Sequence, residues 1–126
     1  MSMERRTRQR EAIWEFIRDV NRPVGPPEIH EGAQVNVDRL GIATVYRAIK
    51  SLVEEGRIVA VSLPGHPPRY EVAGLRHHHH FFCDDCERVF ELTGCDLGRS
   101  PSLPFGFSAD RHEVTVYGRC AECEQR

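Results

Sequence analysis

Five cysteines and a run of histidines are the residues in this chain that are best able to do chemistry. Four of the cysteines form two Cys-x-x-Cys pairs, Cys83 with Cys86 and Cys120 with Cys123. Each pair can place two thiolates on one side of a tight turn, and four thiolates make a closed tetrahedral set of the kind that holds structural Zn²⁺. Such a site would staple a short segment that has few large apolar side chains of its own.

A redox Cys-x-x-Cys motif is the competing interpretation of these pairs. It predicts one pair opening a helix beside a parallel sheet, whereas two pairs bracketing short strands favour zinc. Disulfides are disfavoured because the basic, non-apolar start of the chain does not resemble a secretion signal, and the cytosol keeps thiols reduced. The fifth cysteine, Cys95, lies outside both pairs, and we interpret it as a small semi-buried side chain.

The histidine run His77–His80 directly precedes the first cysteine pair. On a strand, alternate side chains point to opposite faces, so His78 and His80 would share one face while His77 and His79 share the other. Four consecutive histidines are hard to justify by packing, because each brings polar nitrogens that need partners. The run therefore favours metal binding, with two sites completed by carboxylates or histidines from elsewhere in the chain.

Apolar side chains recur at helical spacing in the first half of the chain and predict three helices. These run from about Thr7 to about Val20, from Pro26 to about Ala33, and from the Gly41–Thr44 segment to a stop at Gly56. The outer face of the third helix carries Tyr46, Arg47 and Lys50, which can reach phosphates and base edges. Its composition is that of a recognition helix.

Two short strands, Ile58–Leu63 and Arg69–Val72, follow the third helix and are joined by a turn-rich tip. Three helices and a hairpin make a winged helix-turn-helix, although a small helical domain with a solvated basic helix has a similar pattern. The basic arm Arg5–Arg10 is open to two interpretations. It suits a contact to phosphates or the minor groove, and it also suits a solvated helix start.

Short alternating segments replace the helical pattern near residue 74. His77–Cys83, Arg88–Leu92 and His112–Tyr117 are typical of strands. We therefore expect an α+β protein with a winged-helix domain at residues 1–73 and a small zinc-stapled α/β domain at residues 74–126.

Composition narrows the class of protein further. Hydrophobic residues make up 40% of the chain and the net charge is −2, while no apolar run approaches the ~20 residues that a bilayer span requires. We expect a cytoplasmic protein without membrane contact.

A metallohydrolase or deaminase is disfavoured, because no His-x-Glu is followed by Pro-Cys-x-x-Cys and a closed cysteine set leaves no zinc-bound water. We expect no enzyme activity.

In order along the chain, the segments Gly41–Arg47, His77–His80, Cys83–Cys86 and Cys120–Cys123 resemble the ferric uptake regulator family. This resemblance spans nearly the whole chain. It implies a homodimeric repressor, with an N-terminal winged helix and a C-terminal dimerisation domain, that binds operator DNA when a divalent metal occupies a regulatory site.

Tyr46 and Arg47 would then face DNA, Arg5 would reach the minor groove, and Arg10 would match a common arginine of the first helix. The DNA-binding set that we expect is Arg5, Arg10, Thr44, Tyr46, Arg47 and Lys50.

The resemblance also implies a regulatory metal site formed by Glu71, His78, His80 and Glu91, a nitrogen and oxygen set suited to Fe²⁺, Mn²⁺ or Zn²⁺. Many members add a histidine from the winged domain, but Pro23 stands at that position here; His30 or His66 are the possible substitutes. Peroxide-sensing members favour aspartates where Glu71 and Glu91 stand, and zinc-sensing members often carry a cysteine just before the histidine run. Since neither feature is present, iron is the favoured metal, with manganese and zinc as alternatives.

A second metal site is implied at His77, His79 and His112, together with an acidic residue from the helix that follows the Glu91 strand. Here that helix would be short and poor in helix formers, so Asp96 is the candidate for the fourth ligand.

Together these expectations describe a repressor of metal-homeostasis genes. Its operator would be a pseudo-palindrome, AT-rich if the arginine arm enters the minor groove. A zinc-ribbon protein that stores metal or binds partners is the alternative from a different class, and it predicts metal uptake without any change in DNA affinity.

Overall fold

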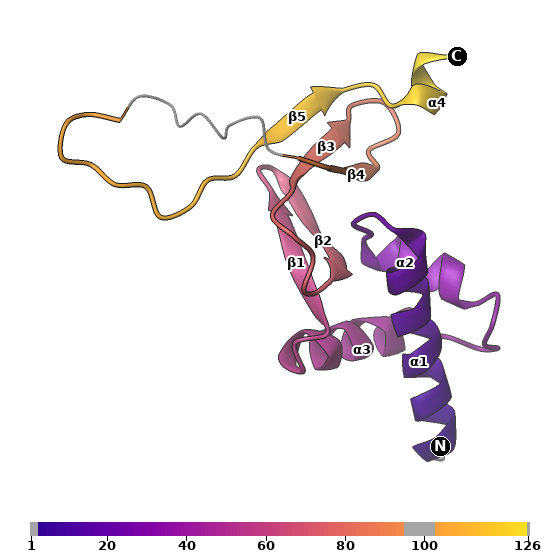
Figure 1. Ribbon diagram of the computed structural model, residues 1–126. Coiled ribbons are helices and arrows are strands. Elements are labelled where there is room, and N and C mark those ends of the chain that lie inside the picture. Colours follow the sequence, from indigo (N-terminus) through magenta and orange to yellow (C-terminus); the bar gives the residue numbers. More distant parts are fainter. Residues whose placement is uncertain (1–2, 95–102, 126) are drawn as a thin grey trace. The chain divides into compact units, whose positions relative to one another are not determined.

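The computed structural model describes residues 3–94 and 103–125 (Figure 1). Contacts between Cα atoms divide the chain into two compact units, Met1–Gly74 and Leu75–Arg126. Each unit has its own core. Aliphatic side chains such as Ile13, Ile29 and Leu52 form the first, whereas the second is formed by cysteines with Phe81 and Phe90 packed against them.

Three helices open the first unit: α1 at Met3–Val20, α2 at Pro26–Ala33 and α3 at Ile42–Glu54. The predicted second and third helices are confirmed to within two residues. The first begins earlier than the predicted Thr7, because the intervening Glu4, Arg5 and Arg6 are long unbranched residues that favour helix. The basic arm is therefore helical, and Thr7 lies inside the helix instead of capping it.

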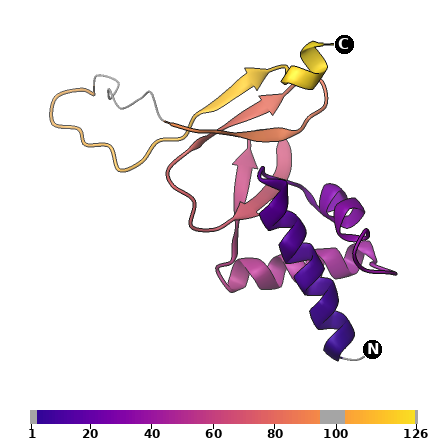
Figure 2. The same cartoon turned by 45° about the vertical axis from the view of Figure 1, so that its right-hand side comes forward.

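A β-hairpin completes the first unit, and it begins directly after α3 (Figure 2). Strands β1 at Ile58–Leu63 and β2 at His66–Val72 pair antiparallel, with Val59 opposite Glu71. The second strand begins at His66, before the predicted Arg69. Its two prolines are tolerated since a two-stranded hairpin leaves one edge of each strand without a ladder. Backbone bonds between Val24 and Tyr70, of 2.9 and 2.8 Å, tie the hairpin to the helices.

The second unit contains a three-stranded sheet in the order β4-β3-β5. Strand β3 at His79–Cys83 is central, antiparallel to β4 at Val89–Leu92 and parallel to β5 at Thr115–Gly118. A short helix, α4 at Ala121–Glu124, follows β5. All three predicted strands are present but shorter than expected, since a central strand can extend only as far as its neighbours offer ladder partners.

The architecture is the predicted α+β arrangement, with a winged helix-turn-helix followed by a small mixed unit. Cys95 and Asp96 lie outside the described residues. None of the helices in the described ranges combines the length and the apolar character that crossing a membrane requires.

Candidate metal centres and nucleic-acid face

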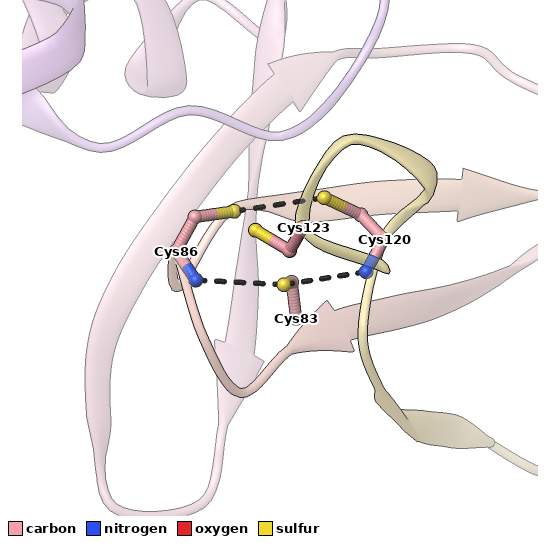
Figure 3. Close-up of side chains that lie close together, drawn as sticks. All are labelled: Cys83, Cys86, Cys120 and Cys123. Carbon is pink, nitrogen blue, oxygen red and sulfur yellow. Dashed lines mark hydrogen bonds between the residues drawn. The ribbon is translucent and has the colours of Figure 1, made fainter. Parts of the chain in front are cut away.

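The four paired cysteines come together in the second unit (Figure 3). Cys83 ends β3 and Cys86 follows it in a turn, while Cys120 precedes α4 and Cys123 lies within it. The parallel pairing of β3 with β5 places Cys83 opposite Gly118, which brings the two distant pairs to the same end of the sheet. The four sulfurs all lie within 4.8 Å of one another.

The spacing of these sulfurs agrees with tetrahedral zinc. A Zn–S bond of about 2.3 Å puts tetrahedral thiolates about 3.8 Å apart, and the Cys86 and Cys120 sulfurs are 3.9 Å apart. None of the four forms a disulfide. The chemistry of the donor set therefore fits a structural Zn²⁺, held by Cys83, Cys86, Cys120 and Cys123, which would cross-link β3 to α4.

The pKa values of the cysteine thiols are shifted in opposite directions by hydrogen bonds and by burial. Burial opposes ionisation of Cys83, but backbone N–H groups, led by those of Cys86 and Cys120 at 3.5 and 3.3 Å, outweigh it and lower its pKa to about 6. At Cys123, burial raises the pKa to about 12. Four ionised sulfurs are thus stable here only beside a cation, which supplies the missing positive charge.

Arg88 is a contact of this cluster that the sequence analysis missed. Its Nε donates to the Cys86 sulfur at 3.1 Å, and one Nη donates to the Cys120 sulfur at 3.7 Å and to Glu122 at 2.8 Å. Although burial opposes ionisation of Cys86, the Arg88 guanidinium outweighs it and holds the pKa of that thiol below its usual value. A zinc ion with four thiolates carries a net charge of about −2, so Arg88 offsets part of that charge.

Replacing Arg88 by alanine is expected to lower the zinc affinity by about 10- to 100-fold, the usual effect of removing an outer-sphere partner, and so to speed the transfer of zinc to a competing chelator. Zinc release to a chromophoric chelator measures this. Arg111→Ala, an exposed arginine of the same unit, is the matched control and should behave like the wild type. Arg88→Lys should give an intermediate rate, because it keeps the charge and loses the fork of donors. Equal release rates for Arg88→Ala and the wild type would contradict the assignment.

His77, His79 and His112 form a second cluster in the same unit. One nitrogen from each lies within 4.8 Å of the others, and the Nε2 atoms of His77 and His112 are 3.1 Å apart. His79 is only 6% exposed. Burial, reinforced by His77 and His112, lowers the pKa of His79, so this imidazole is neutral at physiological pH, as a metal ligand must be. Three imidazoles can hold a divalent metal, whereas the predicted fourth ligand, Asp96, lies outside the described residues.

His78 and His80 lie together on a separate side of the run, with ring centroids 4.8 Å apart. The Nδ1 of His78 is 2.7 Å from the carbonyl oxygen of Arg76, to which it donates, leaving Nε2 as the ligand atom. Glu91 stands directly opposite His80 in the β3–β4 ladder. Directly opposed residues of an antiparallel pair put their side chains on one face of the sheet. Glu91 therefore lies on the same face of the sheet as His80, on the strand next to the one that carries this imidazole.

Glu71 is a buried residue of β2 in the first unit, 6% exposed. Of the two histidines considered as replacements for Pro23, His30 has a structural role within that unit, since its Nε2 lies 2.6 Å from the Leu40 carbonyl oxygen. His66 begins β2 and is partly exposed.

The outer face of α3 carries the residues expected to contact DNA. Val45, Ala48, Ile49 and Leu52 are buried on its inner face. Tyr46 is 56% exposed, and Arg47 and Lys50 are exposed beside it, so none of the three is used by the core. Arg47 donates to the Thr44 hydroxyl at 3.0 Å. On α1, Arg10 is partly buried and forms an ion pair with Glu55, while Arg5 is partly exposed.

The sequence of this chain is similar to those of known regulatory proteins. A profile of the ferric uptake regulator family matches residues 2–117. The ferric uptake regulation protein of Campylobacter jejuni is 29% identical over 125 residues, which cover 95% of this chain and 80% of that protein.

The fold is similar to that of solved regulators. A zinc-bound manganese uptake regulator superposes with a TM-score of 0.76 at 23% identity, covering 89% of this chain and 87% of that chain. The Helicobacter pylori ferric uptake regulator, described as having three functional metal binding sites, gives a TM-score of 0.68 at 22% identity, covering 92% and 79%. These likenesses establish the fold.

Proposed function

The chain belongs to the ferric uptake regulator family, and from this membership we propose that it is a homodimeric repressor that binds operator DNA when a divalent metal fills a regulatory site. Members of the family are metal-responsive transcription regulators. The observation that carries the proposal is the pair of imidazoles His78 and His80, with Glu91 opposite His80 in the ladder, a nitrogen and oxygen donor set distinct from the cysteine cluster. The cysteine cluster would hold a structural zinc ion, and the histidine and glutamate side chains would bind the metal that is sensed.

We assign the regulatory site to Glu71, His78, His80 and Glu91. The buried carboxylate of Glu71 belongs to the hairpin, whereas the other three belong to the second unit. A metal held by all four would therefore couple the DNA-reading unit to the dimerisation unit, and its occupancy would favour the arrangement that binds DNA. Imidazole and carboxylate without thiolate suit Fe²⁺, Mn²⁺ and Zn²⁺ alike; iron is the favoured metal because the aspartates of peroxide-sensing members and the cysteine of zinc-sensing members are both absent, with manganese and zinc as alternatives.

The first unit would contact the operator DNA. Tyr46, Arg47 and Lys50 would meet base edges in the major groove, with Thr44 at the start of the helix and Arg10 contacting phosphates. Arg5 would reach the minor groove, which favours an AT-rich operator. Two copies related by a two-fold axis read a pseudo-palindrome, as for other helix-turn-helix dimers.

Selection of binding sites from a randomised duplex library, run anaerobically with Fe²⁺, Mn²⁺ or Zn²⁺, tests the proposal. We expect one enriched pseudo-palindrome with the sensed metal and none with the zinc-only protein after mild chelation. Metal should raise the affinity for that duplex by about 5- to 150-fold, the usual range of coupling between sites.

Glu91→Gln should abolish this metal response while the cysteine site keeps its zinc. Glu15→Gln, an exposed residue of α1, is the control and should respond like the wild type. Metal uptake at the His78–His80 cluster with no change in DNA affinity would contradict the proposal and favour a storage role instead.

A further inference from the structure

A cavity of about 500 Å³ lies between α1 and α3 within the first unit. Arginines dominate its lining: Arg6 and Arg10 come from α1, Arg47 from α3, and Arg57 from the segment after α3. Hydroxyl groups of Thr44 and Ser51 add further hydrogen-bond donors along one side. A lining of this composition is suited to an anion.

Carboxylates offset only part of the positive charge. Glu11, which also lines the cavity, pairs with Arg57 at 3.4 Å, and Glu55 pairs with Arg10. Arg57 also lies over the Trp14 ring, 4.3 Å from its centroid. Four guanidinium groups thus face two carboxylates, and a net positive charge remains in a chain whose overall charge is −2.

Arg10 provides a second, independent observation. Its Nε atom is buried and has no hydrogen-bond partner among the described residues. The same guanidinium pairs with Glu55 through Nη, but a buried N–H without an acceptor is still costly, so such an atom usually marks a place that a ligand or solvent fills. Its position in the lining of the cavity points to an anionic acceptor there.

We propose that this cavity binds phosphate groups of the DNA backbone, with Arg6, Arg57 and Ser51 as contacts beyond the recognition helix's outer face. The proposal rests on the function proposed above. Thr44, Arg47 and Ser51 recur at helical spacing and form a stripe of α3 beside the exposed face that carries Tyr46 and Lys50, and Arg47 borders both. A DNA strand whose bases contact Tyr46 would run its sugar-phosphate backbone along this stripe. The volume lies in the ~300–1,000 Å³ range of whole ligand sites, which suits a stretch of sugar-phosphate more than a single free phosphate.

Binding to a random-sequence duplex, measured by fluorescence anisotropy over a series of salt concentrations, tests the site. Each phosphate contact that is lost should reduce the slope of log K against log [salt] by about one. Arg6→Gln should show this reduction together with a loss of roughly threefold to tenfold in affinity at low salt. Arg18→Gln, on the same helix but paired with Asp19 outside the cavity, makes the same charge change and should keep the wild-type slope.

Equal slopes for Arg6→Gln, Arg18→Gln and the wild type would overturn the proposal. Free anions are tested with inorganic pyrophosphate at matched ionic strength. Pyrophosphate that stabilises the wild type but not Arg6→Gln against heat, with no difference in DNA slope, would make the cavity a free-anion site and would also overturn the DNA assignment.

Running the series with chelator and with Mn²⁺ separates this proposal from the regulatory one. A slope reduction in Arg6→Gln under both conditions supports the cavity assignment even if metal leaves the affinity of the wild type unchanged, which would count against metal sensing. Conversely, metal-enhanced binding with identical slopes would retain the sensing proposal and reject the phosphate site.

Discussion

Cys123→Ser will lose bound zinc and unfold the second unit while the first unit stays folded. Zinc binding by structural sites is worth about 10–16 kcal/mol at neutral pH, which exceeds what a small unit gains from its own apolar core. In this unit the core is the cysteine cluster itself, with Phe81 and Phe90 against it. The first unit keeps its structure because its core of aliphatic side chains contains none of these cysteines.

Zinc stoichiometry by mass spectrometry and amide NMR spectra of both units will measure this outcome. Cys95→Ser is the matched control, because Cys95 belongs to neither Cys-x-x-Cys pair and its loss should leave the zinc content of the wild type unchanged. Removing zinc from the wild type with a strong chelator should reproduce the Cys123→Ser spectrum. Dispersed signals from β3 and β5 in the zinc-free variant would show that the metal is not what holds the unit together.

Tyr46→Ala will abolish preference for the selected operator without affecting the fold. The ring is 56% exposed on α3 and takes no part in the core, so little stability depends on it. Loss of a base contact of this kind should cost about 1–3 kcal/mol per monomer, which for two copies on one operator is about 2–6 kcal/mol, or roughly 30-fold to 25,000-fold in affinity.

Competition between the selected operator and a random duplex separates this effect from that of the cavity. Tyr46→Ala should bring the two affinities together, whereas Arg6→Gln should lower both in proportion. Asp19→Ala, an exposed residue of α1, serves as the control and should retain the wild-type preference. An unchanged preference in Tyr46→Ala would remove α3 from its assigned role.

Much of the secondary structure was predictable because its signals are local. The buried face of α3 follows from apolar residues at helical spacing, and Gly56, with φ of 74°, ends that helix where a left-handed residue is needed. The α4 helix was not predicted, since four residues around two metal-ligand positions carry no periodicity. The early start of α1 was missed because its first turns are amphipathic only in part, and intrinsic propensity decides them.

Residue types and spacing determined which chemistry this chain can do: two Cys-x-x-Cys pairs for a closed thiolate set, and alternating histidines for two separate groups. These properties depend on neighbours in the chain, so they can be read without a fold. Which groups meet was decided by the tertiary structure. The β3–β5 register brings Cys120 to Cys83, the turn at residues 84–86 brings Arg88 back onto the sulfurs, and the packing of α1 on α3 gathers arginines around one cavity. Such contacts join residues far apart in sequence, and they arise from strand register and helix packing, which no short motif encodes.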